Sequence, residues 1–407
     1  MAFDTICVKK TVDELRSALS DGRIDKIHQP EKDELMISVR SISGNKKLVA
    51  SASANNARIH FTSTTKENPQ TPPMFCMLLR KHLSGGKITK ITQVDFERII
   101  EIDVESYNDL GDLTTKHLIL EIMGRNSNII LCYEDYVIID AIKRVDFTQS
   151  SYRQILPGAR YVSPPAQDKT AILSGQIQNV SIDLSREGTN PSKAIMEVVS
   201  GISPVTAAEI IFRATGKTAS VCGELTVIDK ENIKKELLLF AEKLEYKPCI
   251  IFDDSGKPID FSATEIRQYG SFGRVEYRDT ISEVVESFYA ERDKKERMRQ
   301  KSADLMKLLT NHLERCTKKL IIQEKTMRDA ENKEKYKIFG DLLTANLYRI
   351  KDGETSVVVE NYYEEDCPQI KIELSPMLSG AKNAQRYYKL YQKLKNAEIE
   401  VEKQRKA

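Results

Sequence analysis

Two arginines stand beside acidic or polar residues within strongly apolar sequence, where a side chain could meet RNA. Arg98 follows Glu97 in the run Phe-Glu-Arg-Ile-Ile, and Arg125 lies in the run Glu-Ile-Met-Gly-Arg-Asn. An arginine at a strand end can bind phosphate through two parallel hydrogen bonds or stack on a base. An intramolecular ion pair or a solvated strand face explains the same pattern, so the residues alone leave both readings open.

A cationic stretch further along the chain could also contact RNA phosphates. Residues 292–301 contain six cations against two acids. Such a helix face suits phosphate, although an ordinary solvated helix has the same composition. The turn Gly-Ile-Ser-Pro at 201–204 could direct backbone amides at a phosphate, but it is short and generic. The candidates for phosphate contacts are Lys294, Lys295, Arg297 and Arg299.

Patterns for other chemistries are missing from the sequence. The five histidines lie far apart without HxxxH or HExxH spacing, which argues against a histidine metal site. Gly85-Gly86 is not followed by the Lys-Ser of a phosphate-binding loop, and neither GxGxxG nor GxSxG occurs. We therefore expect no metal, no cofactor and no catalytic residue.

The sequence predicts a sheet that positions these candidates. Residues 1 to about 165 contain short alternating or apolar runs broken by glycine, proline and asparagine, which is typical of an antiparallel sheet. Two helices are expected beside it. One covers residues 11–20, and the other covers 74–83, between Pro72-Pro73 and Gly85-Gly86.

The pattern becomes helical from Ser192 on both sides of residues 201–204, as in a helix-hairpin-helix unit. Strand-like sequence returns near residue 246, so we expect the helical unit to be an insertion and the sheet to be completed after it. The predicted boundaries are 1–170 for the first part of the sheet domain, 171–228 for the helical unit and 229–280 for the completion.

A long helical arm is expected to follow. Residues 281–333 contain neither glycine nor proline, and a helix of this length reaches roughly 75 Å. The heptad phase slips, which favours an arm that folds back over a strict zipper. We expect a small insert at 334–380 and a return helix over 381–407, whose pattern stops unfinished at Ala407 and indicates a truncated chain.

Composition limits the class of protein. The 407 residues allow two to four domains, and 62 Lys and Arg against 60 Asp and Glu give a net charge of only +2, which indicates no particular partner. With neither a signal-peptide pattern nor an apolar run of roughly 18 residues, we expect a cytoplasmic protein without a membrane partner. The seven widely spaced cysteines are expected to be reduced core thiols.

Several segments together resemble one family, the bacterial NFACT family. They are MAFD at the start, PMFCMLLRKHL at 73–83, the pair Glu97-Arg98, EIMGRNSNIIL at 121–131, PGARYVSPP at 157–165, GISP at 201–204 and YKIFGDLLTANLY at 336–348. The resemblance runs in order along essentially the whole chain. Only the family's C-terminal RNA-binding module and the rest of the return helix have no counterpart.

The resemblance implies an α+β fold. Its first domain would be similar to the N-domain of formamidopyrimidine-DNA glycosylases, interrupted by a helix-hairpin-helix domain and followed by a long antiparallel coiled-coil arm with a small middle insert. It also implies a ribosome-associated quality control factor, which binds the obstructed large (50S) ribosomal subunit carrying peptidyl-tRNA. Such a factor recruits tRNA, tRNA-Ala in bacteria, and directs untemplated C-terminal tailing that marks the nascent chain for degradation. The peptidyl transferase centre supplies the chemistry, so the protein would not be an enzyme.

The resemblance also assigns residues. The family's aspartate-arginine pair for tRNA handling corresponds to Glu97-Arg98, where glutamate adds one methylene and moves the carboxylate by about an ångström. A glutamate-isoleucine-methionine patch corresponds to Glu121, Ile122 and Met123 without change. Together with Arg125, these are the residues for which tRNA binding is expected.

Two alternatives remain. The family's older name suggests a surface adhesin for fibronectin or fibrinogen, against which the missing signal peptide and wall anchor argue. The fold analogy suggests a DNA glycosylase, but Ala2-Phe3 stands where those enzymes use proline and glutamate.

Overall fold

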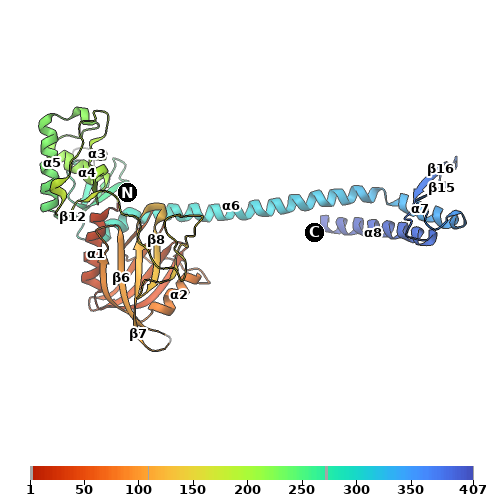
Figure 1. Cartoon of the computed structure of the whole chain (residues 1–407), viewed down its shortest axis with the longest axis horizontal. Helices are drawn as coiled ribbons and strands as arrows, with labels where there is room; N and C mark the ends of the chain where they lie inside the picture. Colours follow the sequence, from red (N-terminus) through yellow and green to blue (C-terminus); the bar gives the residue numbers. More distant parts are fainter. Residues whose placement is uncertain (1–2, 109, 271–273, 407) are drawn as a thin grey trace. The chain divides into compact units, whose positions relative to one another are not determined.

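The computed structural model describes residues 3–108, 110–270 and 274–406 (Figure 1). Contacts divide the chain into two compact units, one up to Glu296 and the other from Arg297. Among the helices of the described residues, none combines the length and the apolar character that a bilayer crossing requires.

A nine-stranded sheet forms the centre of the first unit, with strand order β4-β3-β2-β1-β5-β6-β7-β8-β9. Every neighbouring pair is antiparallel, so the predicted antiparallel sheet and the α+β class are confirmed. The strands are β1 (Arg23–Glu31), β2 (Glu34–Ser41), β3 (Gly44–Ser51), β4 (Arg58–Phe61), β5 (Lys87–Gln93), β6 (Ile99–Tyr107), β7 (Leu113–Glu121), β8 (Asn128–Tyr133) and β9 (Ile138–Ala141).

Two helices, α1 (Thr5–Leu19) and α2 (Met74–Leu83), pack on one face of this sheet. The bounds of α2 agree with the prediction, but α1 begins six residues before the predicted start at residue 11. The carboxylate of Asp4 accepts a hydrogen bond from the Cys7 amide at 2.9 Å and caps the helix. The apolar stripe of α1, which includes Ile6 and Leu15, is buried in the main core.

The opposite face of β6, β7 and β8 has a smaller core of its own. Because side chains alternate along a strand, Ile99, Ile119 and Ile130 point to this side, while their neighbours enter the main core. Ile155 from the segment after β9 covers them. These strands are therefore buried on both faces over part of their length.

A helical region follows, with α3 (Pro191–Val198), α4 (Pro204–Thr215) and α5 (Val227–Glu242). Short strands β10 (Thr170–Ala171) and β11 (Val199–Ser200) pair in parallel beside it. Ser203 caps α4, Pro204 occupies its first turn and Gly216 ends it in the left-handed region. The helices on both sides of residues 201–204 were predicted, whereas their assignment to the helix-hairpin-helix class stays a prediction. Helix α5 crosses the predicted boundary at residue 228.

The strands after α5 differ from the expectation. β12 (Tyr246–Phe252), β13 (Pro258–Thr264) and β14 (Arg274–Tyr277) form a separate three-stranded sheet in the order β13-β12-β14. They do not extend the large sheet, so the predicted completion of that sheet is wrong. Their apolar face nevertheless packs into the same core through Ile250 and Phe261. Burial of this face was visible in the sequence, but hydrogen-bond partners were not.

Helix α6 (Ile281–Glu331) confirms the predicted long helix. In the second unit it is followed by α7 (Lys333–Ala345), the hairpin β15 (Ser356–Glu360) and β16 (Gln369–Glu373), and α8 (Gly380–Lys406). Phe339, Val359 and Tyr387 share a second hydrophobic core. Every side chain of α6 from residue 301 to residue 322 is exposed, and the coiled-coil pairing stays a prediction.

All seven cysteines are free thiols. Five are buried, as expected, but Cys316 and Cys367 are exposed, so for these two the predicted core position is wrong. The reason is that α6 buries little of its surface around Cys316.

Candidate nucleic-acid interface

The two predicted tRNA-binding segments are neighbours in the structure. Glu97-Arg98 directly precedes β6, whereas Glu121 ends β7 and is followed by Ile122 and Met123. Ile99 is paired with Glu121 across the sheet, and the Ile122 amide donates to the Arg98 carbonyl at 2.9 Å. Antiparallel pairing therefore brings together residues that are more than twenty positions apart in the sequence.

The turn between β5 and β6 holds the Glu97-Arg98 pair in place. Its central residues, Asp95 and Phe96, have φ of 48° and 53°, a region that residues other than glycine seldom adopt. The Phe96 ring packs on Gly201, where an added Cβ would lie 2.7 Å from Cε1 of that ring. The segment 201–204 thus supports the predicted RNA site by accepting an aromatic ring at close range.

A buried aspartate joins two helix N-termini below this turn. One oxygen of Asp4 accepts from the Cys7 amide, and the other accepts from the Ser203 amide at 2.9 Å and the Thr206 hydroxyl at 3.2 Å. Burial raises the pKa of Asp4, and the hydrogen bonds oppose that shift. Arg98 is half-buried. Burial lowers its pKa, and the negative charges of Glu97 and Asp4 act in the opposite direction.

Glu121 is directed into the protein. The Arg153 guanidinium donates to both oxygens of its carboxylate at 2.6 Å, and the Tyr161 hydroxyl donates to one of them at 2.9 Å. Burial and the charge of Glu121 raise the pKa of Tyr161, so its hydroxyl remains a donor. Glu121 and Ile122 are each only 1% exposed, and Met123 is half-buried. Ile122 is buried in the main core and Glu121 is buried against Arg153 and Tyr161, so these two side chains offer almost no surface to a ligand. Binding of tRNA by this patch stays a prediction.

Arg125 is exposed and lines a hollow of about 490 Å³. It lies in a single turn of 3-10 helix, Gly124–Asn126, held by the Ser127 hydroxyl, which accepts from the Met123 amide at 2.7 Å. Among the residues that the structure describes, the side chains around the hollow include four cations and an exposed tyrosine but no carboxylate. The residues that the sequence analysis missed here are Lys143, Arg144, Tyr152 and Arg153.

Three of these four cations already have partners. Arg144 donates to both oxygens of Asp140 at 2.9 and 3.0 Å, Lys143 donates to a backbone carbonyl, and Arg153 is occupied by Glu121. Arg125 is the cation of the hollow for which the described residues supply no counter-charge. A cationic hollow with an exposed aromatic ring suits a phosphate and an adjacent base. The dipeptides Lys143-Arg144 and Tyr152-Arg153 were the signal available in the sequence.

The four predicted cations of α6 are distributed along one helical stretch. Lys294, Lys295 and Arg299 are exposed, and Arg297 is half-buried. The boundary between the two units falls after Glu296, within this stretch. Their contact with RNA phosphate stays a prediction.

Ala2, one of the two residues used to argue against glycosylase activity, lies outside the described residues.

Comparison with known proteins gives a consistent family. The sequence profile for "NFACT N-terminal and middle domains" matches residues 4–407. The Bacillus subtilis protein named "Rqc2 homolog RqcH" is 38% identical over 99% of this chain and 69% of its own length. A protein of the same name from Streptococcus pneumoniae serotype 2 is 33% identical over 98% of this chain and 67% of its own length.

A solved structure agrees with this assignment. The structure described as the fibrinogen binding protein from Staphylococcus aureus has a TM-score of 0.57 and 31% identity, covering 71% of this chain and 99% of that chain. The match along residues 4–407 and the identity with these relatives show that the chain belongs to the NFACT family and is a homologue of the RqcH proteins.

Proposed function

We propose that this protein is a ribosome quality control factor. It would bind the obstructed 50S subunit carrying peptidyl-tRNA, recruit tRNA, tRNA-Ala in particular, and direct untemplated C-terminal tailing of the stalled chain. The observation that carries the proposal is the 38% identity over nearly the whole chain with a protein named as an Rqc2 homologue. As a cytoplasmic factor of this kind it would act without a catalytic residue, because the ribosome supplies peptide-bond chemistry.

The arrangement of the interface supports a division of roles. Arg125 is exposed in a hollow without carboxylates, so it is the residue that we assign to a tRNA phosphate. Arg98 and Glu97 lie on the turn held by Phe96 against Gly201, which would present them in one fixed geometry. Glu121 is occupied by Arg153, so we assign it to positioning the loop that carries Arg125.

The exposed cations of α6 would bind ribosomal RNA separately from the tRNA site. Lys294, Lys295 and Arg299 are exposed on a helix, where phosphate contacts require no rearrangement of the sheet. This contact would contribute affinity without sequence preference, because phosphates carry no sequence information.

The test is recovery of RNA from cells. The protein is expressed in its host with an affinity tag, and the RNA that co-purifies is sequenced for the parent, for Arg125→Ala and for Arg40→Ala. Arg40 is an exposed arginine on β2, so its replacement controls for loss of one surface charge. We expect large-subunit rRNA and one enriched tRNA family with the parent and the control. With Arg125→Ala we expect the tRNA to fall at least fivefold while rRNA is retained.

The same experiment addresses the alternative of a surface adhesin. That alternative rests on the fibrinogen-binding description of a structure with 31% identity. Parent protein free of RNA, together with binding to immobilised fibrinogen or fibronectin, would replace the ribosomal role with the adhesin role. Equal tRNA recovery with Arg125→Ala would leave the ribosomal role and remove the site assignment.

A further inference from the structure

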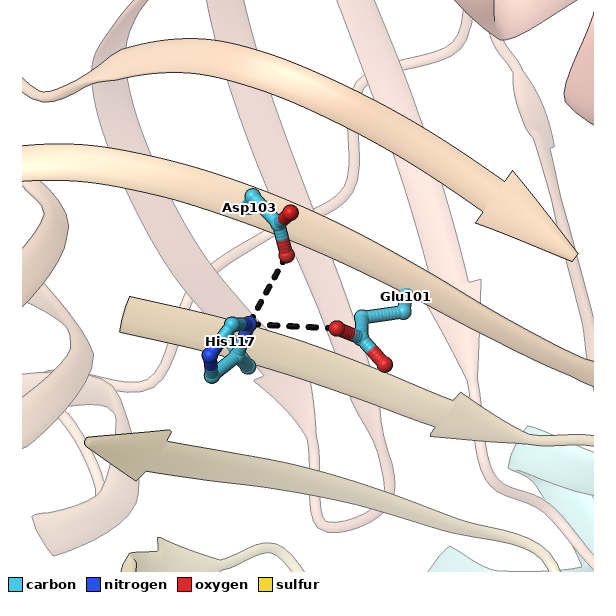
Figure 2. Close-up of side chains that lie close together, drawn as sticks. All are labelled: Glu101, Asp103 and His117. Carbon is cyan, nitrogen blue, oxygen red and sulfur yellow. Dashed lines mark hydrogen bonds and ion pairs between the residues drawn. The ribbon is translucent and has the colours of Figure 1, made fainter. Parts of the chain in front are cut away.

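Three side chains that can bind a metal meet on one face of the sheet, on β6 and β7. Glu101 and Asp103 are alternate residues of β6, and His117 of β7 is paired directly with Asp103. Because side chains alternate along a strand, all three point to the same side. Figure 2 shows both carboxylates directed at one imidazole nitrogen.

The distances make this cluster unusual for an ordinary ion pair. Nδ1 of His117 lies 2.8 Å from Oδ1 of Asp103 and 3.1 Å from Oε1 of Glu101. That nitrogen carries at most one hydrogen, so at most one of the two carboxylates can receive a straight hydrogen bond from it. A single N–H therefore serves two half-buried carboxylates poorly. A bound cation would reduce the repulsion between these two carboxylates.

The donor set fits a transition metal ion. The three ligand atoms, one nitrogen and two oxygens, lie within 4.8 Å of one another. In tetrahedral zinc sites the Zn–N and Zn–O lengths place neighbouring ligand atoms roughly 3.3 Å apart. The present separations of 2.8 and 3.1 Å need to widen by only a few tenths of an ångström to admit the ion.

Tyr136 fixes two of the three ligands from outside. Its ring stacks on His117 with centroids 4.3 Å apart and an angle of 6° between the planes. Its hydroxyl donates to Oε1 of Glu101 at 2.7 Å. Ligand residues of metal sites are commonly oriented by such outer hydrogen bonds, which set the affinity for the ion.

We propose that Glu101, Asp103 and His117 bind one divalent transition-metal ion, and that they prefer zinc to manganese and magnesium. Its three protein ligands leave a fourth position for water. The ion links β6 to β7, the two strands whose ends carry Arg98 and Glu121. Zinc is preferred over manganese because affinity rises along the first-row series, and magnesium is disfavoured because it requires octahedral oxygen ligands. The proposal does not depend on the ribosomal role.

The cluster escaped the sequence analysis because its ligands come from two strands. His117 has no histidine partner at a metal-binding spacing, and Glu101-Ile102-Asp103 reads as an ordinary alternating strand. Within the described part of the chain, this is the one group of three or more such side chains whose ligand atoms converge.

The test uses tag-free protein stripped with chelator and titrated with ZnCl2, MnCl2 and MgCl2 by calorimetry. Metal content is measured by mass spectrometry after dialysis. We expect one equivalent of zinc and a rise in Tm of roughly 5 °C at a hundredfold excess over Kd. Asp103→Asn and His117→Gln should each weaken zinc binding at least a hundredfold. Tyr136→Phe keeps the stacked ring but loses the hydrogen bond to Glu101 and should weaken binding roughly tenfold.

The control is His312→Gln, which removes an exposed histidine of α6 and should bind zinc as the parent does. Absence of zinc binding by the parent would overturn the proposal. So would equal affinity in Asp103→Asn and the parent, or magnesium binding as tight as zinc. Circular dichroism establishes that each variant is folded, and Tyr136→Phe keeps the test informative if His117→Gln does not fold.

Discussion

Arg153 binds Glu121 through two parallel hydrogen bonds of 2.6 Å each, and this pair lies beneath the loop that carries the exposed Arg125. Residues that are close together in the sequence thus have different roles. The Glu121 carboxylate is bonded to Arg153 inside the protein, while Arg125, four residues later, is exposed and accessible to a ligand.

The first prediction concerns this buried pair. Glu121→Ala leaves the guanidinium of Arg153 almost buried without its carboxylate and leaves the Tyr161 hydroxyl without its acceptor. We expect the free energy of unfolding to fall by roughly 3–5 kcal/mol, measured by urea denaturation. Glu134→Ala, an exposed glutamate after β8, is the control and should change stability by less than about 0.5 kcal/mol. A loss below about 1 kcal/mol for Glu121→Ala would contradict the structural role.

The second prediction concerns the contact between Phe96 and Gly201. Gly201→Ala places a Cβ 2.7 Å from the ring and imposes an alanine at φ of 95°. We expect a loss of roughly 1–3 kcal/mol in the free energy of unfolding and a weaker tRNA affinity, because the Glu97-Arg98 turn must move. Gly175→Ala, where nothing lies within 4 Å of the added atom, is the matched control.

Combining Gly201→Ala with Phe96→Ala separates steric from backbone effects. The smaller side chain relieves the clash but not the unfavourable φ, so we expect the double variant to be less destabilised than the sum of the single variants. Additive losses would show that the ring and the glycine do not interact.

The third prediction concerns salt. If Arg125 contacts a phosphate, Arg125→Ala reduces the slope of log affinity against log salt concentration by roughly 0.7–0.9, measured by filter binding of tRNA. Arg40→Ala should leave the slope unchanged.

The double variant Glu97→Ala with Arg98→Ala should remain folded, weaken tRNA binding and abolish tailing. Unchanged tRNA crosslinking in that variant would remove the pair from the interface.

The fourth prediction concerns acid. Burial and the charge of Arg58 lower the pKa of His60 to about 3. The neutral ring is held because the Phe61 carbonyl lies 2.6 Å from one nitrogen and Arg58 donates to the other at 3.2 Å. In the unfolded chain the pKa is near 6.5, so below that pH the unfolded state gains a proton that the folded state excludes.

The contribution of neutral His60 to the free energy of unfolding is therefore fully present above pH 6.5. It is lost as the pH falls toward 3. The expected loss between pH 7 and pH 5 is about 2 kcal/mol, on the order of 1.4 kcal/mol per pH unit below 6.5. Urea denaturation of His60→Gln should show a flatter pH profile than the parent over this range. His312→Gln, at an exposed position, should retain the slope of the parent.

Local sequence patterns predicted most elements because each is encoded within a few residues. Pro73 and Gly85 delimit α2, and alternating apolar residues mark β6 and β7. The large sheet therefore followed from the sequence. The separate sheet of β12, β13 and β14 did not, because an apolar face tells that a strand is buried but not which strand it pairs with.

The sequence named only part of the candidate site and did not show which of its side chains are exposed. The family resemblance identified Arg98, Glu121 and Arg125, whereas the fate of each side chain depends on partners distant in the sequence. Arg153 lies 32 residues from Glu121, and Asp4 lies 199 residues from Ser203. Such pairs leave no periodic signal, so burial of Glu121 became visible only in three dimensions.

The exposed stretch of α6 between residues 301 and 322 has a dynamic consequence. A helix whose side chains are all exposed gains little from tertiary packing and depends mainly on its own hydrogen bonds and intrinsic propensity, which makes local opening inexpensive. Its amide hydrogens should exchange with deuterated solvent far sooner than those of β7, which is buried on both faces over its second half. The amide exchange rate of this stretch therefore reports binding, because any surface that covers Leu305, Leu309 and Leu313 will slow the exchange.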